Sequence, residues 1–184
     1  MTTATKDAIK ASFMKQLNRK PLSKITVREI VDDCGINRNT FYYHYTDIRA
    51  LVDEIFDEQS CQLRRSVEGK SIYECLTTAI GFALENKVAM LHIYNSDDRE
   101  VLEQYILHST ERAVSEYIAF MTAPYKLRPE DEEAIVLYYK SLTSGFAVDW
   151  LSNGMKYNLG DKLKRVCDLF DGTFETVIRR SRKI

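Results

Sequence analysis

The sequence predicts an all-α protein, and three observations lead to that class. Proline and glycine are scarce, with three and seven copies in 184 residues. No segment shows the alternation of a half-buried strand, and apolar residues recur instead at helical spacing along the chain. We expect about nine helices, with a three-helix, helix-turn-helix head over residues 1–46 and a helical body over residues 47–184.

The head begins with a helix predicted from Lys6 to Arg19. Ile9, Phe13 and Leu17 recur every fourth residue and form its apolar face. Pro21 follows and marks the break before the next helix.

The next two helices have strong start and stop signals. Thr26 and Glu29 have the spacing of a capping box, and Gly35 is the expected left-handed stop of the helix that they begin. Asn37 is a good N-cap for a third helix over about Arg38–Tyr45. These cues predict two short helices joined by a tight turn.

The body is predicted to be helical to its end. Asp47 is expected to cap its first helix, and the chain should turn around Gly69 and Lys70. Asn153 and Gly154 should stop the helix that precedes the last one. The expected ranges are residues 47–67, 72–85, 88–94, 99–121, 129–152 and a single final helix from about 158.

The composition is that of a globular protein, with 45% hydrophobic and 29% charged residues. The longest apolar run, residues 134–139, is far too short to span a membrane. The N-terminus lacks the apolar stretch of a signal peptide. We therefore expect a cytoplasmic protein that makes no use of a membrane.

The cysteines and histidines do not suggest a metal site or a cofactor. Cys34, Cys61, Cys75 and Cys167 form no CxxC pair, and three of them fall on apolar helix faces, which predicts reduced core thiols. The three histidines form no HExxH pair. A small helical hydrolase or isomerase is the rival hypothesis. No Ser-His-Asp order, glycine-rich phosphate loop or metal cluster supports it, so we predict that the chain is not an enzyme.

The charge is unevenly distributed, although the net charge is only −1. Residues 1–50 hold nine basic and five acidic side chains, whereas the rest holds 17 basic and 22 acidic ones. A basic head on an acidic body suits a protein that touches nucleic-acid phosphates with its head alone.

The third helix has the residue types of a DNA-recognition helix. Arg38 can bind guanine and Asn39 can bind adenine through paired hydrogen bonds, so both are candidate base readers. Phe41 and Tyr45, four residues apart, are expected to anchor the helix in the core. The candidate phosphate donors are the polar aromatics of this helix and the start of the second helix: Tyr42, Tyr43, His44, Thr26 and Arg28. The alternative is that these aromatics are partly buried, which is nearly as good an interpretation for His44.

The segment from Ile25 to Leu51 resembles the TetR family of transcriptional regulators in residue type and spacing. The resemblance is carried by ITVREI at residues 25–30 and CGINRNTFYYHY at residues 34–45. It implies base contacts from Arg38 and Asn39, and phosphate contacts from Thr26, Asn37, Thr40, Tyr42, Tyr43 and His44. One residue departs from the family, because Ile48 stands where a phosphate-binding lysine is common.

The C-terminal part resembles a TetR subclass that includes DhaS-like regulators, through Gly145 and the segment WLSNG at residues 150–154. The resemblance implies a homodimer formed by the last two helices, bound to a near-palindromic operator on double-stranded DNA. The residues expected in the dimer interface are Gly145, Phe170, Phe174 and Val177.

The resemblance also implies a transcriptional regulator controlled by an effector in the body; we expect a repressor, with an activator as the alternative. The candidate pocket residues are aromatic or polar: Tyr94, Tyr105, His108, Tyr138, Phe146 and Trp150. No basic cluster falls on these faces, so we expect a small apolar or neutral effector, or a protein partner instead. The alternatives are that these aromatics are plain core, or that the chain is an interaction adaptor that has lost DNA binding.

Overall fold

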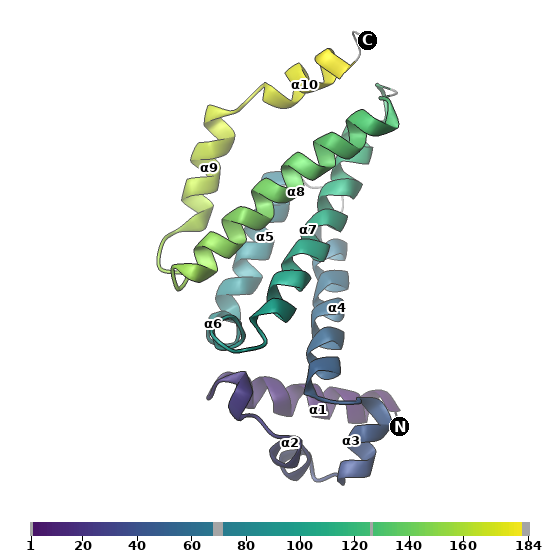
Figure 1. Cartoon of the computed structure of the whole chain (residues 1–184), viewed down its shortest axis with the longest axis vertical. Helices are drawn as coiled ribbons and strands as arrows, with labels where there is room; N and C mark the ends of the chain where they lie inside the picture. The colour runs from purple at the N-terminus through teal and green to yellow at the C-terminus, as the bar shows by residue number, and fades with distance from the viewer. Residues whose placement is uncertain (1, 68–71, 126, 182–184) are drawn as a thin grey trace. The chain divides into compact units, whose positions relative to one another are not determined.

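The structure is a computed structural model that describes residues 2–67, 72–125 and 127–181. Its described residues form ten α-helices, one short 3-10 helix and no strand, which confirms the all-α class (Figure 1). The turn predicted around Gly69 and Lys70 lies outside the described residues. The helices are α1 (Thr2–Leu17), η1 (Leu22–Lys24), α2 (Val27–Cys34), α3 (Arg38–His44), α4 (Ile48–Val67), α5 (Ile72–Glu85), α6 (Lys87–Tyr94), α7 (Arg99–Thr122), α8 (Pro129–Ser152), α9 (Leu159–Leu169) and α10 (Thr173–Ser181).

The chain divides into two compact units. The first comprises Met1–Arg65 and Phe82–Tyr105, and the second comprises Ser66–Gly81 and Ile106–Ile184. The first unit therefore contains the predicted head together with most of α4, all of α6 and the start of α7. No helix in the described part of the chain is both long and apolar enough to cross a membrane.

The core of the first unit is built on α1. Ile9, Phe13 and Leu17 are buried, as their spacing predicts. The Ser12 hydroxyl donates to the carbonyl oxygen of Ile30 in α2, at 3.4 Å. These contacts make α1 the support on which α2 rests.

Helix α4 joins the head to the rest of the first unit. The Asp47 carboxylate accepts a hydrogen bond from the Ala50 amide at 2.8 Å, which confirms the predicted cap. Glu54 on α4 pairs with Lys6 and with Lys10 of α1, each at 2.7 Å. Lys10 also pairs with Glu58. The first unit thus holds α1 against α4 with both apolar and ionic contacts.

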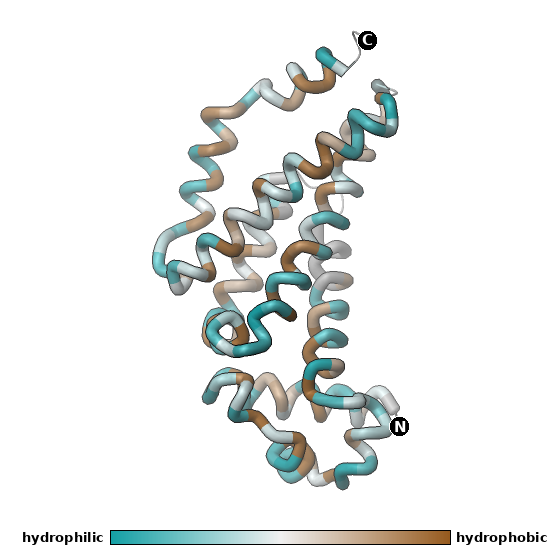
Figure 2. Tube along the Cα trace, in the orientation of Figure 1, coloured by the Kyte–Doolittle hydropathy of each residue, from teal (hydrophilic) through white to brown (hydrophobic). Residues whose placement is uncertain are grey.

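The second unit has its own core. Val114 and Ile118 of α7, Ile135 of α8 and Ile178 of α10 form its buried cluster. Gly154 adopts the left-handed conformation, with φ of 67°, at the predicted end of α8. Hydrophobic residues recur along α8 after its acidic first turn, as Figure 2 shows.

The prediction of one continuous final helix is wrong. The segment forms α9 and α10, and Gly172 between them has a φ of 74°, which an α-helix does not accommodate. Cys167 and Phe170, which precede this glycine, are exposed. Helical spacing of apolar residues predicts a continuous helix, but it does not reveal that a glycine in the left-handed conformation turns the chain within it.

Candidate nucleic-acid interface

The start of α2 is organised by a complete capping box at Thr26. The Thr26 hydroxyl accepts from the Glu29 amide at 3.3 Å, and the Glu29 carboxylate accepts from the Thr26 amide at 3.0 Å. Lys20 lies 2.5 Å from the same carboxylate. Hydrogen bonds from Lys20 and then Thr26 lower the pKa of Glu29 to about 2. The cap fixes the direction in which α2 leaves the preceding loop.

This cap gives the head a measurable dependence on pH. A carboxylate whose pKa is lowered on folding stabilises the fold above its ordinary pKa of 4.5, and loses that contribution as the pH falls toward about 2. The Glu29→Gln variant is expected to lose this part of the pH dependence, since glutamine keeps the capping geometry without the charge. Urea unfolding across that pH window measures it. If the free energy of unfolding depends on pH in the same way in wild type and in Glu29→Gln, the ion pair of Glu29 contributes nothing.

The turn between α2 and α3 depends on Gly35. Its backbone lies in the left-handed region, with φ of 66° and ψ of 29°. The Ile36 amide donates to the Val31 carbonyl oxygen at 3.0 Å and closes the end of α2. A side chain at Gly35 would strain this conformation by roughly 1–2 kcal/mol. The structure thus confirms the predicted stop.

Helix α3 has one buried side and one exposed side. Asn37 caps it, and its side-chain oxygen accepts from the Thr40 amide at 2.8 Å. Phe41 is 0% exposed, and Tyr45, which follows α3, is buried against it. Tyr42 and Tyr43 are 54% and 77% exposed. A buried anchor beneath exposed polar aromatics is the arrangement that a recognition helix requires.

The predicted DNA-contacting residues all lie on α2, α3 or their N-caps, within the first unit. Arg38 and Asn39 are exposed at the first turn of α3. His44 is half-buried beside the edge of the Tyr43 ring. The remaining predicted residues are exposed except Thr40, which is half-buried: Thr26, Arg28, Asn37, Thr40, Tyr42 and Tyr43.

Two of the predicted phosphate donors already use their hydroxyl groups within the caps. The Thr26 hydroxyl donates to Glu29 at 2.8 Å, and the Thr40 hydroxyl donates to Asn37 at 3.1 Å. Each hydroxyl has one hydrogen, so a phosphate contact from either requires it to rotate away. The Glu29 and Thr40 amides are also used by these caps, whereas a first-turn amide that no cap uses can donate to a phosphate without such a cost.

The six predicted pocket residues are divided between the two units, with Tyr94 and Tyr105 in the first and the other four in the second. Tyr105 stacks on Phe56, with ring centroids 4.2 Å apart. Tyr94 is buried, and the Arg99 guanidinium lies over its ring. Trp150 is buried, and its indole N–H donates to the Tyr157 carbonyl oxygen at 2.9 Å. The remaining three differ in exposure: Phe146 is half-buried, while His108 and Tyr138 are exposed.

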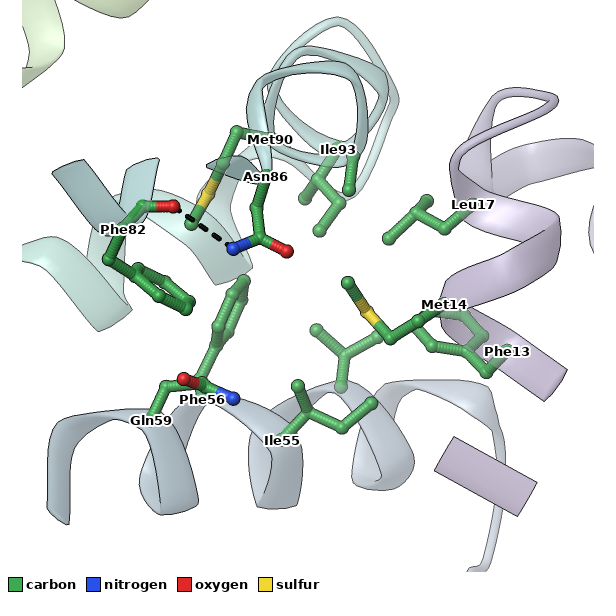
Figure 3. Close-up of a pocket in the computed structure, with 12 residues that line it drawn as sticks. Phe13, Met14, Leu17, Ile55, Phe56, Gln59, Phe82, Asn86, Met90 and Ile93 are labelled. Carbon is green, nitrogen blue, oxygen red and sulfur yellow. Dashed lines mark hydrogen bonds between the residues drawn. The ribbon is translucent and has the colours of Figure 1, made fainter. Parts of the chain in front are cut away.

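A cavity of about 60 Å³ lies elsewhere in the first unit, between α1, α4, α5 and α6 (Figure 3). Phe13 and Leu17 of α1 line it, although the sequence marked them only as core. The sequence feature that could have indicated this cavity is a pair of amide side chains, Gln59 on α4 and Asn86 before α6. The other residues that line the cavity are apolar. The two amides come together only because particular faces of the helices pack against each other, and the spacing of apolar residues does not specify which faces do so.

The predicted dimer residues fall into two groups. Gly145 and Phe170 are exposed, whereas Phe174 and Val177 are half-buried and pack against the core cluster of the second unit. Leu137, at 60% exposed, lies on the α8 face that also carries Gly145. This α8 face, defined by its helical spacing, comprises Ala134, Leu137, Tyr138, Ser141, Leu142 and Gly145.

Two family models together match most of the chain. The model for bacterial regulatory proteins of the TetR family matches residues 12–55, and the model for a transcriptional regulator C-terminal region matches residues 70–172. No curated protein sequence matches the chain.

Similar solved structures include two regulators. The dihydroxyacetone kinase operon activator DhaS is 17% identical, with 97% of this chain and 96% of that chain covered and a TM-score of 0.69. NalD of Pseudomonas aeruginosa, the secondary repressor of the MexAB-OprM multidrug efflux pump, is 16% identical, with 90% and 94% covered and a TM-score of 0.58. At these identities the likeness establishes the fold. With a matching head and a matching body, the chain belongs to the TetR family and is a DNA-binding transcriptional regulator.

Proposed function

We propose that this regulator is a homodimeric repressor that binds a near-palindromic operator and is controlled by a small neutral effector. The observation that carries the proposal is the division of α3 into a buried anchor, Phe41, and an exposed polar side. Arg38 and Asn39 read base edges, and Tyr42 and Tyr43 donate to phosphates. NalD is a secondary repressor and DhaS an operon activator, and we propose repression because a head bound at a promoter would block access to that DNA.

The proposed dimer rests on the α8 face. Leu137 and Tyr138 are more than half exposed, and Phe170, at the end of α9, is 60% exposed. A monomer rarely leaves large apolar side chains grouped as Leu137, Tyr138 and Leu142 are on this face. A Cβ built on Gly145 meets no described atom within 4 Å, so packing among the described residues does not require glycine there. Close approach of a second α8 supplies a reason for it.

The Leu137→Glu variant is expected to raise the dissociation constant of the dimer at least tenfold. It places an unpaired charge in the proposed interface, where burial without a partner is costly. Phe120→Glu is the matched control, since Phe120 is an exposed aromatic of α7 in the same unit. Sedimentation at micromolar concentration should show a dimer for wild type and for Phe120→Glu. A monomeric wild type, or a dimeric Leu137→Glu, contradicts this interface.

The test of the proposed function is a mobility shift with DNA from upstream of the protein's own gene. A repressor binds that duplex far more tightly than a scrambled one. An interaction adaptor or an enzyme shows no such preference. A promoter reporter then gives the sign of regulation. Deletion of the regulator's gene should raise expression of the reporter, because repression is lost.

A further inference from the structure

We infer that Lys10 of α1 is a positioning residue for DNA recognition, because its ion pairs with α4 hold Tyr45, the residue that ends α3. It thereby fixes the direction in which α3 presents its base-reading residues. The inference rests on the proposed function and adds a residue outside the recognition helix on which the preference for the operator depends. The three helices concerned, α1, α3 and α4, meet in the first unit (Figure 1).

Lys10 lies between two carboxylates of α4. Its ammonium is 2.7 Å from a Glu54 carboxylate oxygen, and it also pairs with Glu58. Glu54 and Glu58 are four residues apart on one helix, where like charges repel each other. Without Lys10, only Lys6, which pairs with Glu54 at 2.7 Å, would compensate these two charges. We call Lys6, Lys10, Glu54 and Glu58 the α1–α4 ion cluster.

The Tyr45 side chain lies against the α1–α4 ion cluster. It is 3% exposed, and the Lys6 ammonium lies 5.4 Å from the centre of its ring. Its buried hydroxyl has no hydrogen-bond partner among the described residues. Burial raises the pKa of Tyr45 to about 12, and the negative charge of Glu54 adds to the rise while Lys10 opposes it. Both members of the ion pair thus act on the same hydroxyl.

Tyr45 is also the C-terminal end of the recognition helix. Its amide donates to the Phe41 carbonyl oxygen at 2.9 Å, and the centres of the two rings are 5.7 Å apart. The direction of so short a helix depends on what holds its two ends. Asn37 holds the first end through its cap, and Tyr45 connects the other end with the α1–α4 ion cluster.

A small tilt of α3 is enough to disturb base contacts. The helix has seven residues and is therefore roughly 10 Å long. A tilt of roughly 10° about its Tyr45 end would move the first turn, which carries Arg38 and Asn39, by about 2 Å. Hydrogen bonds to bases do not survive such a shift, since their usual length is about 2.7–3.2 Å. Phosphate contacts are less demanding, because they depend on charge and carry no sequence information. Loss of Lys10 should therefore lower affinity for the operator and spare affinity for random DNA.

The alternative is a direct phosphate contact from Lys10, and the structure argues against it. The Lys10 side chain is 12% exposed, and its ammonium is already paired with two carboxylates. A lysine that binds phosphate would contribute equally to operator and random DNA. Glu54→Gln separates the two roles further, because it makes the head more positive. A charge effect alone would raise affinity for all DNA, whereas a loss of positioning lowers the preference for the operator.

The test measures the affinity of the full-length protein for the upstream duplex and for a scrambled duplex, by fluorescence anisotropy at fixed salt. The ratio of the two affinities is the readout, because partial unfolding of a variant lowers both affinities equally. Lys10→Met and Glu54→Gln should each lower this ratio at least tenfold, about the effect of one lost base contact, although they change the charge in opposite directions. Affinity for the scrambled duplex should stay within about threefold of wild type.

Two further variants serve as controls. Lys10→Arg should keep the ratio within about threefold of wild type, because a guanidinium can pair with both carboxylates. Lys15→Met removes the same charge from the same helix and should also leave the ratio unchanged. Lys15 is 49% exposed and pairs with Asp33 of α2, so its partner lies outside the α1–α4 ion cluster.

Amide NMR shifts without DNA provide a measurement that does not depend on the proposed function. Lys10→Met should shift the amides of Arg38 and Asn39, at the far end of α3 from Tyr45, and Lys15→Met should not. If wild type does not discriminate the two duplexes, the proposed function fails, and these shifts still decide whether Lys10 positions α3. Three results overturn the inference: unshifted Arg38 and Asn39 amides in Lys10→Met, an unchanged affinity ratio in that variant, or an equally low ratio in Lys15→Met.

Discussion

Replacing Phe41 by alanine is expected to destabilise the head by about 3–5 kcal/mol, the usual cost of removing a fully buried aromatic side chain. Phe41 is 0% exposed, and its ring contacts those of Tyr42 and Tyr45, at centroid distances of 5.6 and 5.7 Å. Because this ring anchors α3, DNA binding should be lost together with stability. Urea unfolding gives the change in free energy, and anisotropy with labelled operator gives the loss of binding.

The neighbouring Tyr42→Ala variant separates folding from recognition. Tyr42 is more than half exposed, so its removal should cost less than about 1 kcal/mol of stability. It should nevertheless weaken DNA binding, because the proposed phosphate donor is gone. Equal stability of Phe41→Ala and wild type would mean that α3 is not anchored as described.

The second large effect is expected for Arg38→Ala. Arg38 is exposed in the first turn of α3, where a guanidinium can reach the O6 and N7 acceptors of guanine. Its loss should cost roughly 1–3 kcal/mol at the operator and relax the base preference at one position of each half-site. Competition binding against operators substituted base by base measures both quantities.

Two comparisons make the Arg38 result specific. Tyr43→Phe removes a proposed phosphate contact, so it should weaken operator and random DNA alike. Arg112→Ala removes an exposed arginine of α7 in the second unit and should leave DNA binding unchanged. If Arg38→Ala loses affinity equally for operator and random DNA, Arg38 contacts phosphate instead of a base.

The head could be predicted nearly in full because its signals are local. The starts of α2, α3 and α4 each depend on a hydrogen bond across three residues, at Thr26, Asn37 and Asp47, and the structure contains all three. Gly35 required only its own backbone conformation. Such features are encoded within a few residues, so one sequence is enough to identify them.

The cavity and the α9–α10 break could not be predicted in the same way. Helical periodicity identifies Phe13 and Leu17 as buried, but it does not specify whether they meet a side chain or a void. The residues around the void come from three parts of the sequence that are far apart: α1, α4, and the consecutive helices α5 and α6. The spacing of apolar residues on both sides of Gly172 favours one continuous helix. The helix nevertheless ends there, because Gly172 adopts the left-handed backbone conformation.

The central claim is that α3 reads a specific duplex, and fluorescence anisotropy with wild-type protein tests it most directly. The labelled duplex carries the region upstream of the protein's own gene, and the competitor is a scrambled duplex of equal composition at fixed salt. The account predicts at least a thousandfold preference for the upstream duplex, with affinity that falls steeply as salt rises. Equal affinity for the two duplexes, or no binding to either, would contradict it.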